Sequence, residues 1–392
     1  MSLDGLVILS SYEVSNGGGR LLASVIVIIL VVSGVAVIVG MNSFQETTNT
    51  TTESTTSSTG TTPETSTTSQ TEPTTNPTNP FNVSYVDHDS ISINGDADFA
   101  TKADSEEWSG TGTSDHPFII EGYRITGERV SISIIHTTKY FIIRDCELLP
   151  EHTYETWGID LWDTDNALIQ SCYIEADIGV DFLGSMNSEI QYCEIYGTWV
   201  GVNVSYAHDV VVKENEIYNC ERGIWMDHSI NILLRDNLLK FNTEGVSIWS
   251  SSDSGCIGNR IIDNQFGIYS GGFSYYGYAT NFTMFDNSII GNSIVGIYLN
   301  EGTSSFVLYS NKIGFNYLNA QDNGTSNYWD GNAWSDYNGT GYYYIPGPSE
   351  SVDHSPEVFE STTVLFYKPS PCLTLCALPD KRNNPSSILK TT

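Results

Sequence analysis

Apolar and polar positions through the middle of the chain repeat with a period of about 22 residues. Each repeat begins with a glycine, and the run that follows alternates between apolar and polar residues, as in "GIDLW", "GVDFL", "GIWMD" and "GVSIW". Alternation with a period of two is typical of a half-buried β-strand, and an internal repeat of this length is typical of a solenoid. The repeated glycines are Gly158, Gly179, Gly201, Gly223, Gly245, Gly267 and, after a longer interval, Gly296.

Each repeat also contains two further short apolar segments, which predict three short strands per coil; in one coil they centre on Ile224, Leu234 and Leu239. Three strands joined by tight turns describe an all-β fold, a right-handed parallel β-helix, which is stable because neighbouring coils stack. A leucine-rich repeat is excluded because its LxxLxL phrase is absent, and helical repeats are longer and have a period of 3.6. We therefore expect Val246 and Ile268 to follow Ile224 in one buried column.

Polar residues recur just before the third strand of each coil, where a parallel β-helix has an interior. An inward asparagine there can hydrogen-bond to its copies in the coils above and below, whereas an unpaired buried amide would cost about 1–3 kcal/mol. The sequence thus predicts a structural ladder of Cys172, Cys193, Asn215, Asn237, Asn259, Asn287 and Asn311. Asparagines at a neighbouring corner are expected to adopt left-handed geometry: Asn219, Asn242, Asn264, Asn292 and Asn316.

Residues 21–41, "LLASVIVIILVVSGVAVIVGM", contain no charge, and as a helix they would span about 31 Å. We interpret them as a transmembrane signal anchor; the alternative, a cleaved signal peptide, usually has a shorter apolar core of about 7–15 residues behind a basic start. Arg20 precedes the segment and the next cation is Lys102, which places the C-terminal bulk outside the cell.

The predicted organisation has seven parts. They are a cytoplasmic tail (1–20), the transmembrane helix (21–41), a Thr/Ser-rich disordered stalk (42–80), an N-terminal cap (81–130), the β-helix coils (131–316), a C-terminal cap (317–355) and a disordered tail (356–392).

The formal charge of −31 excludes nucleic acid as a partner and disfavours polyanionic glycans unless a divalent cation bridges the two surfaces. Seven cysteines, an odd number without a CxxC pair, do not imply a complete disulfide framework. Six Asn-x-Ser/Thr sequons fit an exported glycoprotein: Asn49, Asn82, Asn203, Asn281, Asn323 and Asn338.

Two phrases outside the coils resemble a known family. "ISINGDADFA…WSGTGTSDHPFIIEGYRI" (91–125) resembles the opening segment of NosD-like β-helix proteins, and "SNYWDGNAWSDYNGTGYYYIPG" (326–347) is similar to the ending of their archaeal cell-surface members. The resemblance covers about residues 85–355. It implies a right-handed β-helix on the cell exterior, with relatives among carbohydrate-binding and sugar-hydrolysing proteins.

The family includes a periplasmic copper-related protein, but the copper association is not expected here. Exported copper sites favour clustered Met and His, whereas this chain has five Met and seven His, and His208 and His228 fall at different positions of the coil. We predict no dedicated metal site, although Ca²⁺ could bind an acidic face.

The outward positions of the first strand predict the candidate site. Aromatic side chains beside carboxylates form a stacking surface for sugar rings, so we expect a polysaccharide or cell-surface glycan as partner. The predicted binding residues are Trp162, Asp181, Trp225, Asp227, Trp249, Tyr269 and Tyr298.

Three other interpretations stay open for this face. An ordinary solvated surface has the same composition, and a purely structural cell-envelope role needs no ligand. A glycan-active hydrolase, lyase or epimerase would use two carboxylates about 5–9.5 Å apart. Candidates are Asp160, Asp181 and Asp163, although the HG and RIK phrases of polygalacturonases are absent.

Overall fold

The computed structural model describes residues 6–9, 25–32, 35–42, 84–151, 155–271 and 277–360. The chain divides into two compact units, Met1–Thr74 and Thr75–Thr392, which are considered separately. The predicted stalk (42–80) apart from its first residue, nearly all of the predicted tail (356–392) and the sequons at Asn49 and Asn82 lie outside the described residues.

The first unit contains a three-stranded antiparallel sheet of β1 (Leu6–Leu9), β2 (Val25–Val32) and β3 (Val35–Asn42). The helix expected over residues 21–41 is therefore corrected to two strands. Valine and isoleucine dominate both strands, and their branched side chains favour extended backbone. Across the residues that the structure covers, no helix is both long and apolar enough to cross a membrane. The single-pass anchoring inferred from a helix is thus not supported.

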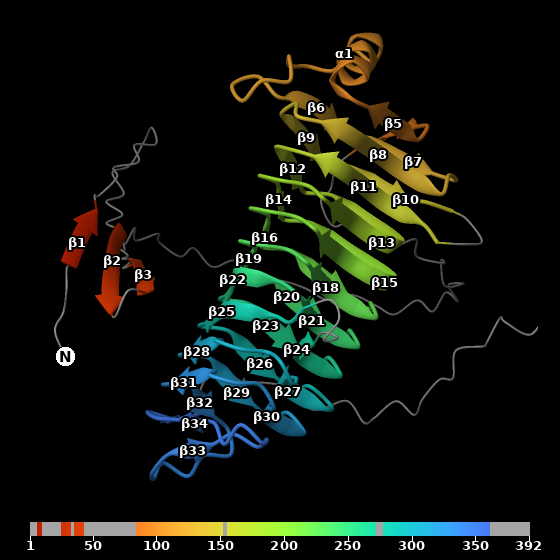
Figure 1. The fold of residues 1–392 in the computed structure, drawn as a ribbon. Helices are drawn as coiled ribbons and strands as arrows, with labels where there is room; N and C mark the ends of the chain where they lie inside the picture. Colours follow the sequence, from red (N-terminus) through yellow and green to blue (C-terminus); the bar gives the residue numbers. More distant parts are fainter. Residues whose placement is uncertain are drawn as a thin grey trace, which may run out of the picture. The chain divides into compact units, whose positions relative to one another are not determined.

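The second unit is an all-β, right-handed-type parallel solenoid of about 11 turns. Its strands stack in register along the axis, as Figure 1 shows. One wall is a 12-stranded sheet, made of β6 (Phe118–Glu121), β9 (Phe141–Arg144), β12 (Ala167–Gln170), β14 (Glu189–Gln191), β16 (Val211–Lys213), β19 (Leu233–Arg235), β22 (Ser252–Ile257), β25 (Thr280–Phe285), β28 (Val307–Tyr309), β31 (Tyr328–Asp330), β34 (Val352–Asp353) and the antiparallel β33 (Tyr343–Tyr344).

The remaining strands form a 20-stranded sheet that supplies the first and third strands of the coils. Its members are β4 (Val86–His88), β5 (Ile91–Asn94), β7 (Tyr123–Thr126), β8 (Val130–Thr137), β10 (Glu147–Leu149), β11 (Trp157–Thr164), β13 (Tyr173–Leu183), β15 (Glu194–Ser205), β17 (Glu216–Tyr218), β18 (Arg222–Asp227), β20 (Leu238–Lys240), β21 (Glu244–Trp249), β23 (Arg260–Ile262), β24 (Phe266–Gly271), β26 (Ser288–Ile290), β27 (Val295–Leu299), β29 (Lys312–Gly314), β30 (Leu318–Asp322), β32 (Ala333–Trp334) and β35 (Glu357–Val358). Parallel pairing continues on both sides of 131–316, from β4 with β7 to β32 with β35, so the coils are longer than the predicted range.

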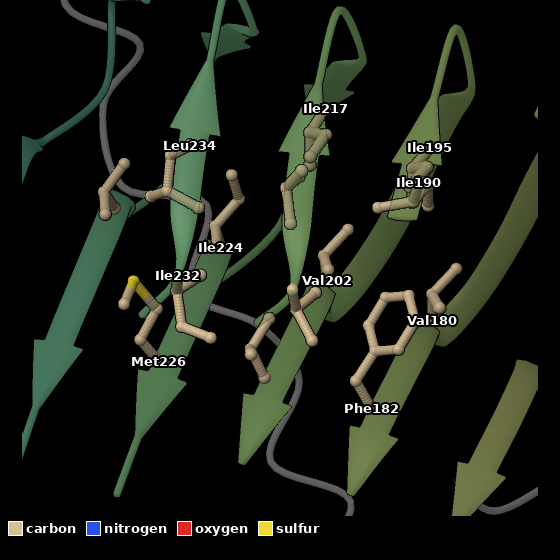
Figure 2. Close-up of a cluster of buried hydrophobic side chains, with 14 of the residues drawn as sticks. Val180, Phe182, Ile190, Ile195, Val202, Ile217, Ile224, Met226, Ile232 and Leu234 are labelled. Carbon is tan, nitrogen blue, oxygen red and sulfur yellow. The ribbon is translucent and has the colours of Figure 1, made fainter. Parts of the chain in front are cut away.

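Successive coils align like residues in the core. Ile224 pairs with Val246, and Val246 pairs with Ile268, and all three side chains are fully buried. Figure 2 shows the same stacking one and two coils earlier, where Val180, Val202 and Ile224 follow one another. Since no coil can bury its apolar face alone, this register is the source of the fold's stability.

Buried asparagines form a continuous ladder along the interior. The side-chain Nδ2 of Asn237 donates to Asn259 Oδ1 at 2.9 Å and to the carbonyl oxygen of Val212 at 2.8 Å. Its Oδ1 accepts from both the backbone N and the Nδ2 of Asn215, so the amide is fully satisfied. The same pattern continues through Asn259, Asn287, Asn311 and Asn332. Cys193 begins the column by donating its backbone N–H to Asn215 Oδ1, and Cys172 lies buried in the same column one coil earlier.

A second ladder corrects the expectation for the neighbouring corner. Asn264 and Asn292 point inward and are buried, and Asn264 Nδ2 donates to Asn292 Oδ1 at 3.1 Å. The left-handed conformation belongs instead to the residue immediately before each asparagine, as in Asp263 (φ 58°) and Gly291 (φ 71°), while Asn219 alone of the five is left-handed itself. The turn therefore bends one residue earlier and turns the amide toward the interior, in a column of Asn242, Asn264, Asn292 and Asn316.

Both ends of the solenoid are closed by aromatic residues. At the N-terminal end, α1 (Asp96–Ser105) buries Phe99, which stacks on Phe118 with ring centroids 4.8 Å apart. At the C-terminal end, Trp329 and Trp334 are fully buried and their indole N–H groups donate to buried carboxylates. These closures keep the open ends of the sheets away from water.

Candidate functional site

The outward side chains of β11, β13, β15, β18, β21, β24 and β27 form one continuous surface, the first-strand face. The backbone register places one residue of each strand beside its equivalent in the next coil. In order, this column is Asp160, Asp181, Asn203, Trp225, Ser247, Tyr269 and Tyr298. The face therefore changes from acidic to aromatic along the axis.

Asp160 and Asp181 are neighbours at the acidic end. Ser133 Oγ donates to Asp160 Oδ2 at 3.1 Å, and Asn203 Nδ2 donates to Asp181 Oδ1 at 2.8 Å. Burial raises the pKa of Asp181 to about 6, with a smaller contribution from the charge of Asp160. Burial also raises the pKa of Asp160. Because β11 and β13 are neighbouring strands, the backbones of Asp160 and Asp181 lie one strand spacing apart, about 4.8 Å.

The other predicted residues of this end lie beside the pair. Trp162 is 50% exposed and packs its ring at a tilt against His136, with centroids 5.4 Å apart. Asp163 is exposed and left-handed (φ 52°) near the end of β11, so it lies outside the column. The structure therefore brings together Asp160 and Asp181 but not Asp163.

Two tryptophans form the centre of the face. The Trp225 and Trp249 rings meet edge to face, with centroids 6.4 Å apart and planes at 75°. The Arg222 guanidinium lies over the Trp225 ring at 4.8 Å, and Arg222 Nε is 3.3 Å from Glu244 Oε2. Trp249 Nε1 donates to Ser247 Oγ at 2.9 Å, whereas Trp225 Nε1 is buried without a hydrogen-bond partner. Residues of two neighbouring strands, β18 and β21, thus hold the two indoles edge to face, and we call this pair the Trp225–Trp249 corner.

The aromatic end continues with stacked tyrosines. Tyr269 and Tyr298 lie parallel, with centroids 5.3 Å apart, and Asn323 Nδ2 donates to the Tyr298 hydroxyl at 3.1 Å. Asp227 lies on the neighbouring outward position and pairs with His228 Nδ1 at 2.8 Å. Burial raises the pKa of Asp227, although His228 opposes this effect. All of these side chains are half-buried.

Sequence reasoning missed the residues immediately before the repeated glycines. These positions are aligned in register and they include Trp157, Arg222, Glu244 and Phe266. Arg222 lies over Trp225 at 4.8 Å, and Phe266 meets Tyr269 edge to face with centroids 5.7 Å apart. The glycine repeat was the available signal, because the residue before each glycine shares one place in every coil.

The donor set of the described residues does not fit a copper ion. Among residues 84–151, 155–271 and 277–360, no three His, Cys, Asp or Glu side chains gather closely enough to hold a metal. The five cysteines that the structure describes are buried, and burial raises the pKa of the Cys172 thiol well above its usual range, which opposes the thiolate that a metal requires. His208 is exposed, and His228 is paired with Asp227.

The described sequons differ in the freedom of their side-chain amides. Asn203 donates Nδ2 to Asp181, Asn281 to Asp253 and Asn323 to Tyr298. Asn338 is exposed, and its Oδ1 accepts from the backbone N and the Oγ1 of Thr340 at 3.1 and 2.9 Å. This local turn leaves Asn338 as the sequon with the most accessible amide among those described.

The fold and its exposed face define a right-handed-type parallel β-helix protein with a surface of carboxylates and aromatic rings. A family model described as "Periplasmic copper-binding protein (NosD)" matches residues 124–349, more than half of the chain, and the chain belongs to this family. No curated protein matches the chain.

Solved structures with a similar fold include three polysaccharide-active proteins. An alginate lyase from Paenibacillus sp. str. FPU-7 is 12% identical, with a TM-score of 0.37 and coverage of 63% of this chain and 97% of the other. The periplasmic alginate epimerase AlgG is 15% identical, with a TM-score of 0.34 and coverage of 68% and 82%. The A-module of the Azotobacter vinelandii mannuronan C-5 epimerase AlgE4 is 13% identical, with a TM-score of 0.39 and coverage of 70% and 87%. At identities this low, the similarity to these structures is a similarity of fold and carries no conclusion about activity.

Proposed function

We propose that the chain is an extracytoplasmic carbohydrate-binding or adhesive β-helix protein whose first-strand face binds a polysaccharide or cell-surface glycan. The observation that carries this proposal is the Trp225–Trp249 corner, which continues into the stacked Tyr269 and Tyr298. Aromatic rings stack on the apolar faces of sugars, while nearby carboxylates, hydroxyls and indole N–H groups bind sugar hydroxyls.

The length of the face favours a polymer over a single sugar. From Asp160 to Tyr298 the column crosses six strand spacings of about 4.8 Å each, which makes a surface about 29 Å long. The register is continuous over this length. An extended ligand can therefore contact several coils at once.

A glycan-array screen tests the proposal. We expect the wild-type chain to bind at least one glycan, and Trp225→Ala and Trp249→Ala each to weaken that binding roughly tenfold, because each removes an aromatic contact of about 1–1.5 kcal/mol. Tyr309→Ala is the matched control: Tyr309 stacks on Phe285 at 4.6 Å, but on the outside of the 12-stranded sheet. A wild-type chain that binds no glycan would refute the proposal and favour a purely structural role in the cell envelope.

A glycan-active enzyme is the second candidate, favoured by the pairing of Asp160 and Asp181. Retaining glycosidases hold two carboxyl groups about 5–5.5 Å apart, one of them with a raised pKa so that it can donate a proton. The register, which places Asp160 beside Asp181 on neighbouring strands, and the raised pKa of Asp181 support this candidate. Release of reducing ends or unsaturated ends from a bound glycan, abolished by Asp181→Asn, would support catalysis over binding alone.

The proposed location is outside the cytoplasm, as the family description implies for its members. We further propose a cell-surface protein of the archaeal type, on the basis of the Thr/Ser-rich segment 42–80 and the "WSDYNGTG" phrase. Copper is not proposed as a ligand because the donor set does not fit it, whereas Ca²⁺ at the acidic end of the face is compatible with the oxygen donors there. Cell fractionation and surface proteolysis of the native chain would test the location.

A further inference from the structure

We infer that the first-strand face selects a neutral glycan, built of uncharged pyranose units, and that the Arg222–Glu244 ion pair sets this selectivity. The inference rests on the proposed carbohydrate-binding function and adds the class of ligand and the residues that determine it.

The Arg222 guanidinium is not available to an anionic sugar. Its Nε faces Glu244 Oε2 at 3.3 Å, and one of its terminal nitrogens is 3.5 Å from Glu221 Oε1. The same group lies over the Trp225 ring at 4.8 Å and near the Trp249 ring at 6.0 Å. The side chains of Arg222 and Glu244 are only 18% and 16% exposed. Recognition of a uronate carboxylate requires a cation with accessible, forked donors, whereas this guanidinium is largely buried and its charge is already offset by two carboxylates.

The rest of the face repels negative charge. The column offers Asp160 and Asp181 at one end, and Asp227 lies beside the tryptophans. The other arginine at this surface, Arg129, lies over Trp157 at 4.8 Å and pairs with Glu155 at 3.7 Å. A uronate polymer along the face would set like charges against one another in a partly dehydrated site, which disfavours it.

The aromatic centre offers neutral hydrogen-bonding groups. Trp225 Nε1 is buried without a partner, Ser247 holds Trp249 through its hydroxyl, and the tyrosine hydroxyls follow on the next coils. Of these groups, the hydroxyls of the half-buried Tyr269 and Tyr298 match sugar hydroxyls, which carry no charge. No carboxylate of the column lies between Trp225 and Tyr298, and the carboxylates beside it are already paired, Glu244 with Arg222 and Asp227 with His228. An ammonium group therefore gains little there. A neutral glycan is therefore the class that the centre of the face fits best.

The Arg222–Glu244 pair also positions the platform. Because the guanidinium contacts both indoles, it holds the Trp225 and Trp249 rings at their mutual angle of 75°. Glu244→Gln keeps the shape of the side chain but removes its charge, which leaves Glu221, a half-exposed carboxylate 3.5 Å from a terminal nitrogen, as the remaining partner of Arg222. This substitution should consequently widen the ligand range toward anionic glycans without removing the aromatic contacts.

Isothermal titration calorimetry on the full chain tests the inference with three polymers: a neutral galactomannan, the polyuronate alginate and the cationic chitosan. We expect wild type to bind the neutral polymer with little dependence on salt, and Glu244→Gln to bind alginate at least about fivefold more tightly than wild type does, in a salt-sensitive way. Glu244→Asp, which keeps the charge, should leave alginate binding at the wild-type level, and Tyr309→Ala is the control on the opposite sheet. Circular dichroism verifies that each variant folds.

The outcomes separate the inference from the function on which it rests. Wild-type binding of alginate or chitosan in preference to the neutral polymer would refute the inference and leave carbohydrate binding intact. Unchanged alginate binding by folded Glu244→Gln would refute the role of the ion pair. Failure of the wild type to bind any glycan, in this set or on the array, would refute the proposed function and the inference together.

Discussion

The carboxylate that ends the first asparagine ladder, Asp353, should be a point of unusual sensitivity. Each side-chain amide of the ladder donates one N–H to the Oδ1 of the next member toward the C-terminal end, so the last member needs an acceptor there. Asn332 donates both its backbone N–H and its Nδ2 to Asp353 Oδ2, at 3.0 and 2.9 Å. The second ladder also ends at an aspartate: Asn316 Nδ2 donates to Asn319 Oδ1 at 3.2 Å, and Asn319 Nδ2 donates to Asp336 Oδ1 at 2.8 Å. An aspartate thus closes each run of oriented amides.

The magnitude follows from the groups that Asp353 satisfies. Its Oδ2 also accepts from Trp334 Nε1 at 3.0 Å, and its Oδ1 accepts from the backbone N–H groups of Gly331 and Ser355 at 2.9 and 3.2 Å. The side chain is fully buried. Hydrogen bonds to a charged group contribute about 1.5–3 kcal/mol each, and their losses are not additive. We expect Asp353→Ala to lower the free energy of unfolding by about 5 kcal/mol. Asp353→Asn should lower it by about 3 kcal/mol, because its amino group faces N–H donors.

Urea unfolding followed by circular dichroism measures both effects. Asn237→Asp is the complementary variant: in the middle of the ladder a carboxylate cannot donate to Val212 or Asn259, so we expect a loss of about 3 kcal/mol there. Glu357→Gln, an exposed change on the neighbouring strand β35, should stay within about 0.5 kcal/mol of wild type. If Asp353→Asn is as stable as wild type, the argument from ladder polarity is wrong.

Three further predictions concern pH, packing and modification. Burial raises the pKa of Asp181 from 3.8 to about 6, so its ionisation opposes folding, and wild type should gain about 2.4 kcal/mol of stability from this group as the pH falls from about 7 to about 4. Asp181→Asn should lack that gain in urea titrations at the two pH values; an equal pH dependence in both proteins would contradict the assignment. Gly245→Ala should cost about 2–3 kcal/mol, since an added Cβ would lie 2.6 Å from the Gly267 carbonyl oxygen, and a thermal unfolding scan that finds no loss would argue against this close approach. In a glycosylating host, mass spectrometry should find Asn338 occupied and Asn203 empty, because Asn203 Nδ2 is bonded within a strand; the reverse occupancy would count against the structure at both positions.

The repeat of the sequence predicts the core of this fold well because each coil must present the same residue at the same place. The glycine spacing and the alternation after each glycine are enough to align Ile224, Val246 and Ile268. The ends are less predictable. There the coils continue through β7 and β32 without the repeated glycine, and closure depends on contacts such as Phe99 with Phe118 that no period encodes.

Two errors have identifiable physical causes. The segment 21–41 is uniformly apolar, which fits a membrane helix, but its Val and Ile content also favours strands, and hydropathy alone does not separate the two. Because asparagine tolerates a left-handed backbone, the sequence predicts it at the corner asparagines, whereas Phe241 and Phe315 adopt it instead and Asn242 and Asn316 turn inward. A continuous hydrogen-bonded column outweighed the local preference of the turn.

The sequence predicts only part of the candidate site. The column from Asp160 to Tyr298 follows from strand alternation, but Arg222 and Glu244 come from the position before the glycine, where the backbone bends and alternation fails. Their importance lies in contacts between coils, from Arg222 to Trp249 and Glu244, that a single repeat does not contain. Pairwise chemistry across coils therefore needs the register before it can be recognised.

The interior ladders and the exterior face are linked through that register. Each coil is fixed to the next by hydrogen bonds of fully buried amides, such as Asn237 to Asn259, which leave no freedom for a strand to slip. The outward rings are consequently held at fixed spacing before any ligand arrives, and a ligand would lose less ordering free energy than on a flexible loop. Weakening the ladder at Asp353 should therefore reduce stability much more than it alters the geometry at Trp225, several coils away. If Asp353→Ala lowers the free energy of unfolding but not glycan affinity, while Trp225→Ala and Trp249→Ala lower glycan affinity but not the free energy of unfolding, the ladders act as scaffold and the face as site.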